Sequence, residues 1–241
     1  MTIKEKMNPN KIARVAGFLY LLMGPFGFFG MLYVPSILIV PGDAAITANN
    51  IMASESLFRS AIVSTLIVQI INIFMILILY KLLKPVNKNC ALHMVIFILI
   101  GAPIAMLNEL NRFAALMLSS GADYLMTVFT ADQLQALVPL FLDLHEHGVT
   151  IAGIFWGLWL FPMGYLVFKS GYIPRILGVF LIIAGFGYLI DSFAVFLLPN
   201  FIAIISKFTQ FTWYGELLLP LWLLIKGVNV EQWEKRALES A

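Results

Sequence analysis

The sequence has little charge and a single cysteine. Only 12% of the 241 residues are charged, whereas a soluble domain usually carries about 25%. Hydrophobic residues make up 61% of the chain, a composition typical of a protein whose main solvent is lipid. Because Cys90 has no second cysteine to pair with, an intrachain disulfide is excluded.

Several chemical signatures are also missing. The chain contains neither the His-Glu-x-x-His pattern of zinc proteases nor the Gly-x-Ser-x-Gly nucleophile turn. It has no basic patch interleaved with aromatic residues, so nucleic acid is not expected as a partner. No cofactor is implied by any motif.

What the sequence does contain is six long apolar runs separated by short, charge-bearing connectors. Each run reaches roughly 20 residues, the length that crosses a bilayer core of about 30 Å. The runs are Ile12–Val40, Ala61–Leu83, Ala91–Leu118, Val149–Phe168, Ile176–Leu198 and Lys207–Ile225. They predict an all-α, polytopic membrane helix bundle with six transmembrane helices. Since these spans and their loops use nearly the whole chain, residues 1–241 are predicted to form a single integral membrane domain.

The basic residues predict an orientation. If the N-terminus is cytoplasmic, most of the 15 Lys and Arg residues lie on the cytoplasmic side. Only Arg59 and Lys207 then fall near the outer side, and Arg112 lies near the outer end of a helix. The positive-inside rule therefore places both termini in the cytoplasm of a cell whose plasma membrane the chain crosses several times.

Two outer connectors, residues 43–56 and 131–147, are predicted to form short amphipathic helices. In the second, Thr130 and Gln133 match a capping box, and the helix is expected to continue through Gly148 into the fourth span. Within the fifth span, small residues recur seven apart and predict a seam of close helix contact. These small residues are Gly178, Gly185 and Ser192.

Polar side chains inside the spans are the candidate functional residues. A charged group at mid-membrane costs roughly 2.5–3.5 kcal/mol on insertion scales, so it needs partners or a wet cavity. Helical-face and depth arithmetic predicts an outward-facing polar cavity with Glu216 near its floor. The predicted binding residues are Arg59, Glu109, Arg112, His145, Asp191 and Glu216.

Three hypotheses account for these residues. In a structural one, Arg112 bonds Glu109 or pairs with Asp191. In a binding or transport one, Glu216 and Asp191 hold a proton or cation, and the arginines attract an anionic small molecule or lipid headgroup. Because six helices are few for a transporter, that hypothesis favours a homo-oligomer.

The third hypothesis is an interfacial enzyme that acts on lipid. Asp143, His145 and His147 supply metal-ligand side chains near the bilayer surface. The spacing of Asp143 and His147 suits an ion pair as well as a ligand pair. His145 continues an apolar stripe and is expected to face protein or lipid.

Several short strings together resemble a known family. They are Val40–Ala45, Ala53–Arg59, Lys84–Asn87, Ser119–Tyr124, Leu142–His145, Ser170–Gly178, Gly187–Ser192 and Leu198–Asn200. The chain resembles, over nearly its full length, an uncharacterised family of prokaryotic multi-pass membrane proteins described only as a domain of unknown function. The resemblance implies a membrane architecture and a bacterial-type plasma membrane. It implies no activity, cofactor or catalytic residue.

Overall fold

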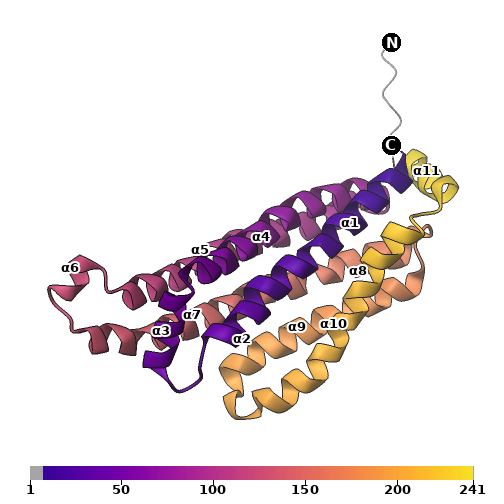
Figure 1. The fold of residues 1–241 in the computed structure, drawn as a ribbon. Coiled ribbons are helices and arrows are strands. Elements are labelled where there is room, and N and C mark those ends of the chain that lie inside the picture. Colours follow the sequence, from indigo (N-terminus) through magenta and orange to yellow (C-terminus); the bar gives the residue numbers. More distant parts are fainter. Residues whose placement is uncertain (1–7, 241) are drawn as a thin grey trace. The chain divides into compact units, whose positions relative to one another are not determined.

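The computed structural model describes residues 8–240, and over these residues the chain is helical with no strand (Figure 1). This confirms the predicted all-α class. In chain order the elements are α1 (Pro9–Gly27), the π-helical turn η1 (Phe28–Tyr33), α2 (Val34–Leu38), α3 (Ala44–Ala53), α4 (Glu55–Leu83), α5 (Lys88–Ser120), α6 (Asp123–Met126), α7 (Ala131–Leu158), α8 (Leu160–Ser170), α9 (Arg175–Leu197), the 3-10 turn η2 (Pro199–Phe201), α10 (Ile202–Ile225) and α11 (Val230–Glu239).

Within the described residues, five helical stretches are long and apolar enough to cross a membrane. They are Pro9–Leu38, Glu55–Leu83, Lys88–Ser120, Ala131–Ser170 and Arg175–Leu197, and they cover the first five predicted spans. The sixth predicted span forms α10, whose 24 residues give it sufficient length. Its composition is more polar because Lys207, Gln210 and Glu216 interrupt the apolar residues. The chain is therefore a multi-pass membrane protein with a sixth, more polar helix.

Several helices extend beyond the apolar runs that predicted them. The second begins at Glu55 rather than Ala61, and the third covers Lys88–Ser120 rather than Ala91–Leu118. Hydropathy locates the part of a helix that lies in lipid, while the polar first and last turns remain helical outside it.

Both amphipathic connectors are helical as predicted. The Asp43 side chain caps α3 by accepting a hydrogen bond from the Ile46 amide at 2.8 Å. The capping box before α7 is reciprocal, with the Thr130 amide 2.9 Å from Gln133 Oε1 and the Gln133 amide 3.3 Å from Thr130 Oγ1. As expected, α7 continues without interruption through Gly148.

The first span is interrupted by a π-helical turn. Between α1 and α2, the Val34 amide donates to the Phe29 carbonyl, five residues back. In the same register the donor for the Gly30 carbonyl would be residue 35, but Pro35 has no N–H. The turn therefore leaves the Gly30 carbonyl oxygen available to another donor.

The chain divides into two compact units, each discontinuous in sequence. Unit 1 contains the residues up to Leu22, residues 71–102 and the residues from Ala152 onward, whereas unit 2 contains residues 23–70 and 103–151. Because the division falls inside α1, α4, α5 and α7, each of these helices contributes residues to both units. The single-domain organisation stays a prediction.

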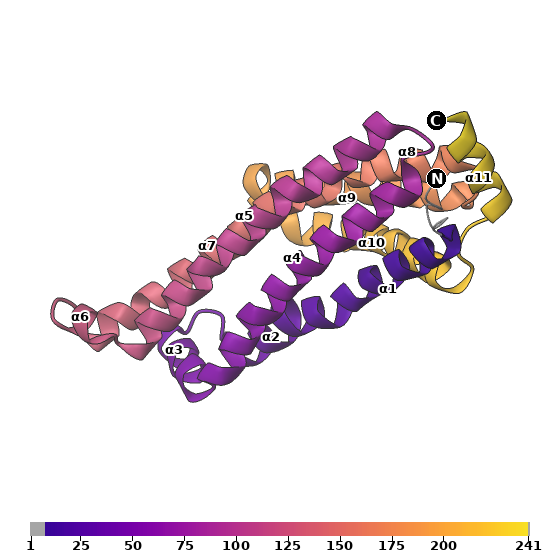
Figure 2. The ribbon, with the colours of Figure 1, turned by 90° about the horizontal axis from the view of Figure 1, so that it is seen from above.

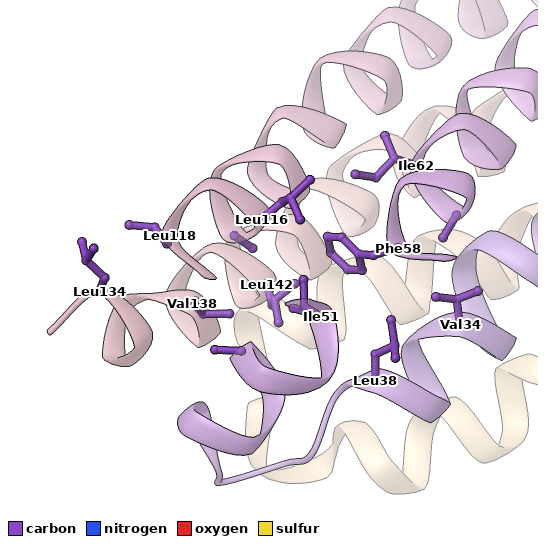
Figure 3. Packing of buried hydrophobic residues seen from close by; sticks show 13 residues of the cluster. Val34, Leu38, Ile51, Phe58, Ile62, Leu116, Leu118, Leu134, Val138 and Leu142 are labelled. Atoms are coloured by element: carbon purple, nitrogen blue, oxygen red, sulfur yellow. The ribbon is translucent and has the colours of Figure 1, made fainter. Parts of the chain in front are cut away.

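Unit 2 has a hydrophobic core built from α2, α3, α4, α5 and α7 (Figure 3). Phe58 and Ile62 of α4 and Ile51 of α3 belong to this core, and all three residues are at most 2% exposed. Leu134 and Val138 bury the apolar stripe of α7 in the same core. The amphipathic connectors are thus packed against the helices instead of only coating the membrane surface.

In unit 1, α9 packs against α8 on one side and α10 on the other (Figure 2). The predicted small-residue seam of α9 meets a second seam on α7 and α8. The facing residues are Gly178 with Gly164, Gly185 with Gly157, and Ser192 with Gly153. A Cβ added at Gly178 would lie 2.5 Å from the Gly164 carbonyl oxygen, so the close approach requires glycine.

Candidate functional site

Unit 2 brings three of the predicted site residues together. Glu109 and Arg112 lie one turn apart on α5, His145 lies on α7, and all three side chains are buried. The Nε2 atom of His145 is 3.1 Å from Glu109 Oε1, and Arg112 Nη1 is 3.7 Å from Glu109 Oε2. The buried carboxylate therefore has a cationic partner, as the structural hypothesis predicted for Glu109 and Arg112. We call these three residues the Glu109 network.

Two asparagines and a glycine fix this network in place. The side-chain amide of Asn108 donates through Nδ2 to the His145 carbonyl at 2.8 Å. The side-chain amide of Asn111 donates through Nδ2 to Asn108 Oδ1 at 2.9 Å. A side chain at Gly148 would collide with the Asn108 amide, so α7 can approach α5 only with glycine at this position.

Arg112 also replaces a hydrogen-bond donor that the π-helical turn lacks. Its Nη1 atom donates to the Gly30 carbonyl at 3.0 Å, the same carbonyl that the turn and Pro35 leave without a helical donor. A Cβ at Gly30 would lie 2.8 Å from the Ala61 carbonyl, so the turn is also pressed against α4. The guanidinium thus joins α5 to the π-helical turn η1 within unit 2.

The three candidate metal ligands do not converge. His145 is buried in the Glu109 network, whereas Asp143 and His147 on the same helix are exposed. Across residues 8–240, no group of three or more His, Cys, Asp or Glu side chains is placed to hold a metal ion. Asp143 and His147 each lie two residues from His145, which is a rotation of about 200° at 100° per residue. The predicted cluster is therefore divided between two faces of α7.

Unit 1 holds the other two predicted acids. Glu216 of α10 accepts a hydrogen bond from the Tyr20 hydroxyl of α1, and Tyr188 of α9 is a second phenol that faces the carboxylate. The Tyr188 ring stacks on Trp213 with centroids 5.5 Å apart, and the Tyr20 ring lies 5.8 Å from that of Trp159. Glu216 is therefore surrounded by aromatic rings and phenolic hydroxyls.

Within residues 8–240, the hydrogen-bond partners of Asp191 on α9 are hydroxyl groups. Ser206 Oγ donates to Asp191 Oδ1 at 2.6 Å, and Thr209 Oγ1 donates to the same oxygen at 2.9 Å. At 1.5 Å per residue, Asp191 lies about 24 Å from the start of α9 at Arg175. Ser206 and Thr209 belong to α10, so the carboxylate joins the two helices of the hairpin.

The acids of the two units have different partners, and Glu109 is buried whereas Asp191 and Glu216 are partly buried. Glu109 faces an arginine and a histidine, whereas neither Asp191 nor Glu216 forms an ion pair within the described part of the chain. Lys207, which follows Ser206 in the chain, is exposed and forms no ion pair with Asp191. The carboxylates on the α9–α10 hairpin thus lack the charge compensation that Glu109 receives.

Arg59 lies apart from the other candidates in unit 2. Its Nε atom is 2.6 Å from Glu55 Oε1, in an exposed ion pair one turn apart on α4. The side chain lies at the edge of an otherwise mainly apolar groove of about 460 Å³ between α1 and α4, lined by residues that include Phe26, Phe29 and Ile67. The structure therefore offers Arg59 a shallow groove rather than a polar cavity.

Sequence reasoning missed three contributors to these sites. Tyr20 is 196 residues away from Glu216, and an aromatic residue in an apolar run gives no signal of a distant partner. Gly30 contributes only a carbonyl, which becomes available through the π-helical turn. Ser206 precedes the predicted start of the sixth span, although its spacing of three from Thr209 places both on one helical face.

The comparisons with known proteins identify the family. The family model described as "Domain of unknown function (DUF4386)" matches residues 15–227. The chain belongs to this family. A relative from the archaeon Archaeoglobus fulgidus, described as an uncharacterized protein, is 31% identical over 172 residues, which cover 71% of this chain and 86% of the relative. No solved structure matches the chain. Family membership confirms the resemblance found in the sequence and leaves the function to be inferred from the site.

Proposed function

We propose that this protein binds monovalent cations within the membrane, a proton at Glu216 and a sodium-type ion at Asp191, and transfers them along the α9–α10 hairpin. The observation that carries the proposal is the contrast between its acids. Glu109 is compensated by Arg112, while the hydrogen-bond partners of Asp191 and Glu216 in the described part of the chain are hydroxyl groups. An acid without a basic partner inside a membrane is most stable with a proton or a metal cation on it.

The surroundings of Asp191 suit a small hard cation. The carboxylate and the hydroxyls of Ser206 and Thr209 are all oxygen ligands, the type that hard cations prefer. A hydroxyl can turn its lone pair to the ion and its proton elsewhere. For Thr209 such acceptors are already present, because its Oγ1 lies 3.3 Å from the carbonyl oxygens of Ile205 and Ser206.

The surroundings of Glu216 favour a proton. Its neighbours are the phenols Tyr20 and Tyr188, and the stacked Trp213 ring lies beside them. This site has bulky rings in place of the small hydroxyl ligands found at Asp191. A carboxyl group in such a site can hold a proton and exchange hydrogen bonds with the phenols as that proton arrives or leaves.

The two sites are successive positions along one helix pair. Thr209 and Glu216 are seven residues apart on α10, or about 10 Å at 1.5 Å per residue. Between them, Thr212 Oγ1 donates to the Thr209 carbonyl at 2.6 Å and lies against Gly187 of α9.

We infer that the positive-inside distribution places the termini in the cytoplasm of a prokaryotic plasma membrane and Asp191 in the outer half of the bilayer.

Sodium binding at Asp191 is testable by thermal stabilisation. With NaCl replaced by choline chloride at constant ionic strength, sodium is expected to raise the free energy of unfolding of the wild-type protein. The gain should reach about 2.7 kcal/mol at a hundredfold excess over the dissociation constant. Asp191→Asn should remove this dependence, because the amide carries no charge to hold the ion.

Asp143→Asn is the matched control, since Asp143 is an exposed acid outside the hairpin. It should retain the full sodium effect. A wild-type protein that melts identically in sodium and choline, or an Asp191→Asn variant that still responds to sodium, would exclude the ion from this site.

A further inference from the structure

A preformed pocket lies at the basic end of unit 1, away from the acidic hairpin sites. It has a volume of about 680 Å³ and is formed by the loop between α8 and α9, the start of α9, the end of α10 and the loop that leads to α11. Figure 1 shows α11 beside this end of α10. The pocket shares no residue with the sites at Asp191 and Glu216.

Among the described residues, the charged side chains that line the pocket have one sign. They are Arg175 and Lys226, and no carboxylate belongs to this described lining. Both side chains are exposed. The Arg175 guanidinium carbon lies 5.8 Å from the centre of the Phe168 ring, within the distance of a cation–π contact. Two cationic side chains that line one pocket complement the negative charge of a phosphate group. An arginine can donate a pair of hydrogen bonds to the phosphate oxygens, and a lysine supplies a point charge.

Part of the remaining wall is apolar, whereas Asn229 and Gln232 add polar side chains to the same lining. Ile173 and Val228 line the pocket with side chains that are 4% and 7% exposed, and Trp222 lies one turn before Lys226 on α10. Tryptophan one turn inside a basic residue is the arrangement that membrane helices place at the level of lipid headgroups. The pocket therefore offers an anion site at its polar side and a surface for the lipid backbone beside it.

Hydrogen bonds hold the walls in position. The Tyr172 hydroxyl donates to the Leu82 carbonyl at 2.8 Å, and the Asn229 amide donates to the Tyr172 carbonyl at 3.1 Å. The Val228 amide donates to Asn10 Oδ1 at 2.8 Å. Burial raises the pKa of Tyr172 well above its ordinary value, so its hydroxyl remains a donor at neutral pH. Because the walls are already held in position, less conformational entropy is lost when a ligand binds.

We propose that this pocket binds the phosphate of one anionic phospholipid. The source is a bilayer lipid, because the pocket combines its cations with an apolar wall and a headgroup-level tryptophan at the ends of two membrane helices. Basic residues that act only as orientation signals need no shared pocket, and Lys84, in the connector between α4 and α5, is an exposed example.

The experiment is native mass spectrometry of the delipidated, full-length protein in mild detergent, supplied with phosphatidylglycerol or phosphatidylcholine. The wild-type protein is expected to retain one phosphatidylglycerol about tenfold better than phosphatidylcholine, a preference in keeping with the attraction of anionic lipid to basic residues. Arg175→Gln with Lys226→Gln should remove this preference. Lys84→Gln should keep it, and Lys226→Arg, which preserves the charge, should bind as the wild type does.

Three results of the retention measurements would overturn the proposal, and a fourth comes from competition with a soluble phosphate ester. The first three are equal retention of both lipids by the wild type, undiminished retention by the folded double variant, and an equal loss in Lys84→Gln. If the double variant does not fold, Lys226→Gln alone provides the comparison and should weaken retention. Displacement of the lipid by an equal concentration of glycerol phosphate would assign the site to a soluble phosphate ester and contradict the lipid assignment.

Discussion

Arg112→Leu is expected to lower the free energy of unfolding by about 3–5 kcal/mol, the range found when one partner of a buried ion pair is removed. The change leaves the Glu109 carboxylate buried with only His145 beside it and removes the donor to the Gly30 carbonyl. For a chain of this size about 2–4 °C is lost per kcal/mol, so the melting temperature in nanodiscs should fall by about 6–20 °C.

The matched control for this prediction is Arg59→Leu. Arg59 also pairs with a glutamate on its own helix, but both side chains are exposed, and such pairs contribute about 0.3–0.5 kcal/mol. Glu109→Leu combined with Arg112→Leu should recover part of the loss, because no carboxylate is then left uncompensated. Equal melting of the Arg112→Leu and Arg59→Leu variants would show that the Glu109 network does not hold unit 2 together.

Glu216→Gln is expected to reduce proton movement across liposomes to the level of liposomes without protein. Glutamine keeps the volume of the side chain and an oxygen that accepts from Tyr20, but it cannot take up a proton. The free energy of unfolding should therefore change by less than about 1 kcal/mol, while the flux, measured with a pH-sensitive dye inside the vesicles, is lost.

Glu55→Gln is the control for Glu216→Gln, because Glu55 is an exposed acid at the first turn of a membrane helix. It should transport as the wild type does. A large loss of folded Glu216→Gln protein in detergent would instead favour the structural hypothesis for this residue. Wild-type flux in the variant would remove Glu216 from the proton path.

The helical architecture could be predicted from the sequence because it depends on local patterns. Apolar length located the spans, and the capping side chains of Asp43 and Thr130 located two helix starts within one residue. The interruption of the first span could not be predicted in the same way. A π-helical turn depends on how the backbone donors after Phe29 are redistributed, which no residue pattern specifies.

The candidate sites could be predicted only in part. Periodicity placed His145 on the buried face of α7, and a spacing of three suggested that Arg112 pairs with Glu109. Periodicity does not specify which helices meet. The contact between Glu109 and His145 spans 36 residues, and that between Tyr20 and Glu216 spans 196, so both required the tertiary structure. The predicted outward-facing cavity above Glu216 stays a prediction.

Uptake and release of a proton by Glu216 can be measured by infrared difference spectroscopy of the protein in bilayers. Spectra recorded across a change of bulk pH, in H₂O and D₂O, report the C=O stretch of protonated carboxyl groups. The wild-type protein should show a band that titrates reversibly and shifts in D₂O, and this band should be absent from Glu216→Gln. A wild-type spectrum without a titrating carboxyl band, or the same band undiminished in Glu216→Gln, would contradict proton uptake and release at Glu216.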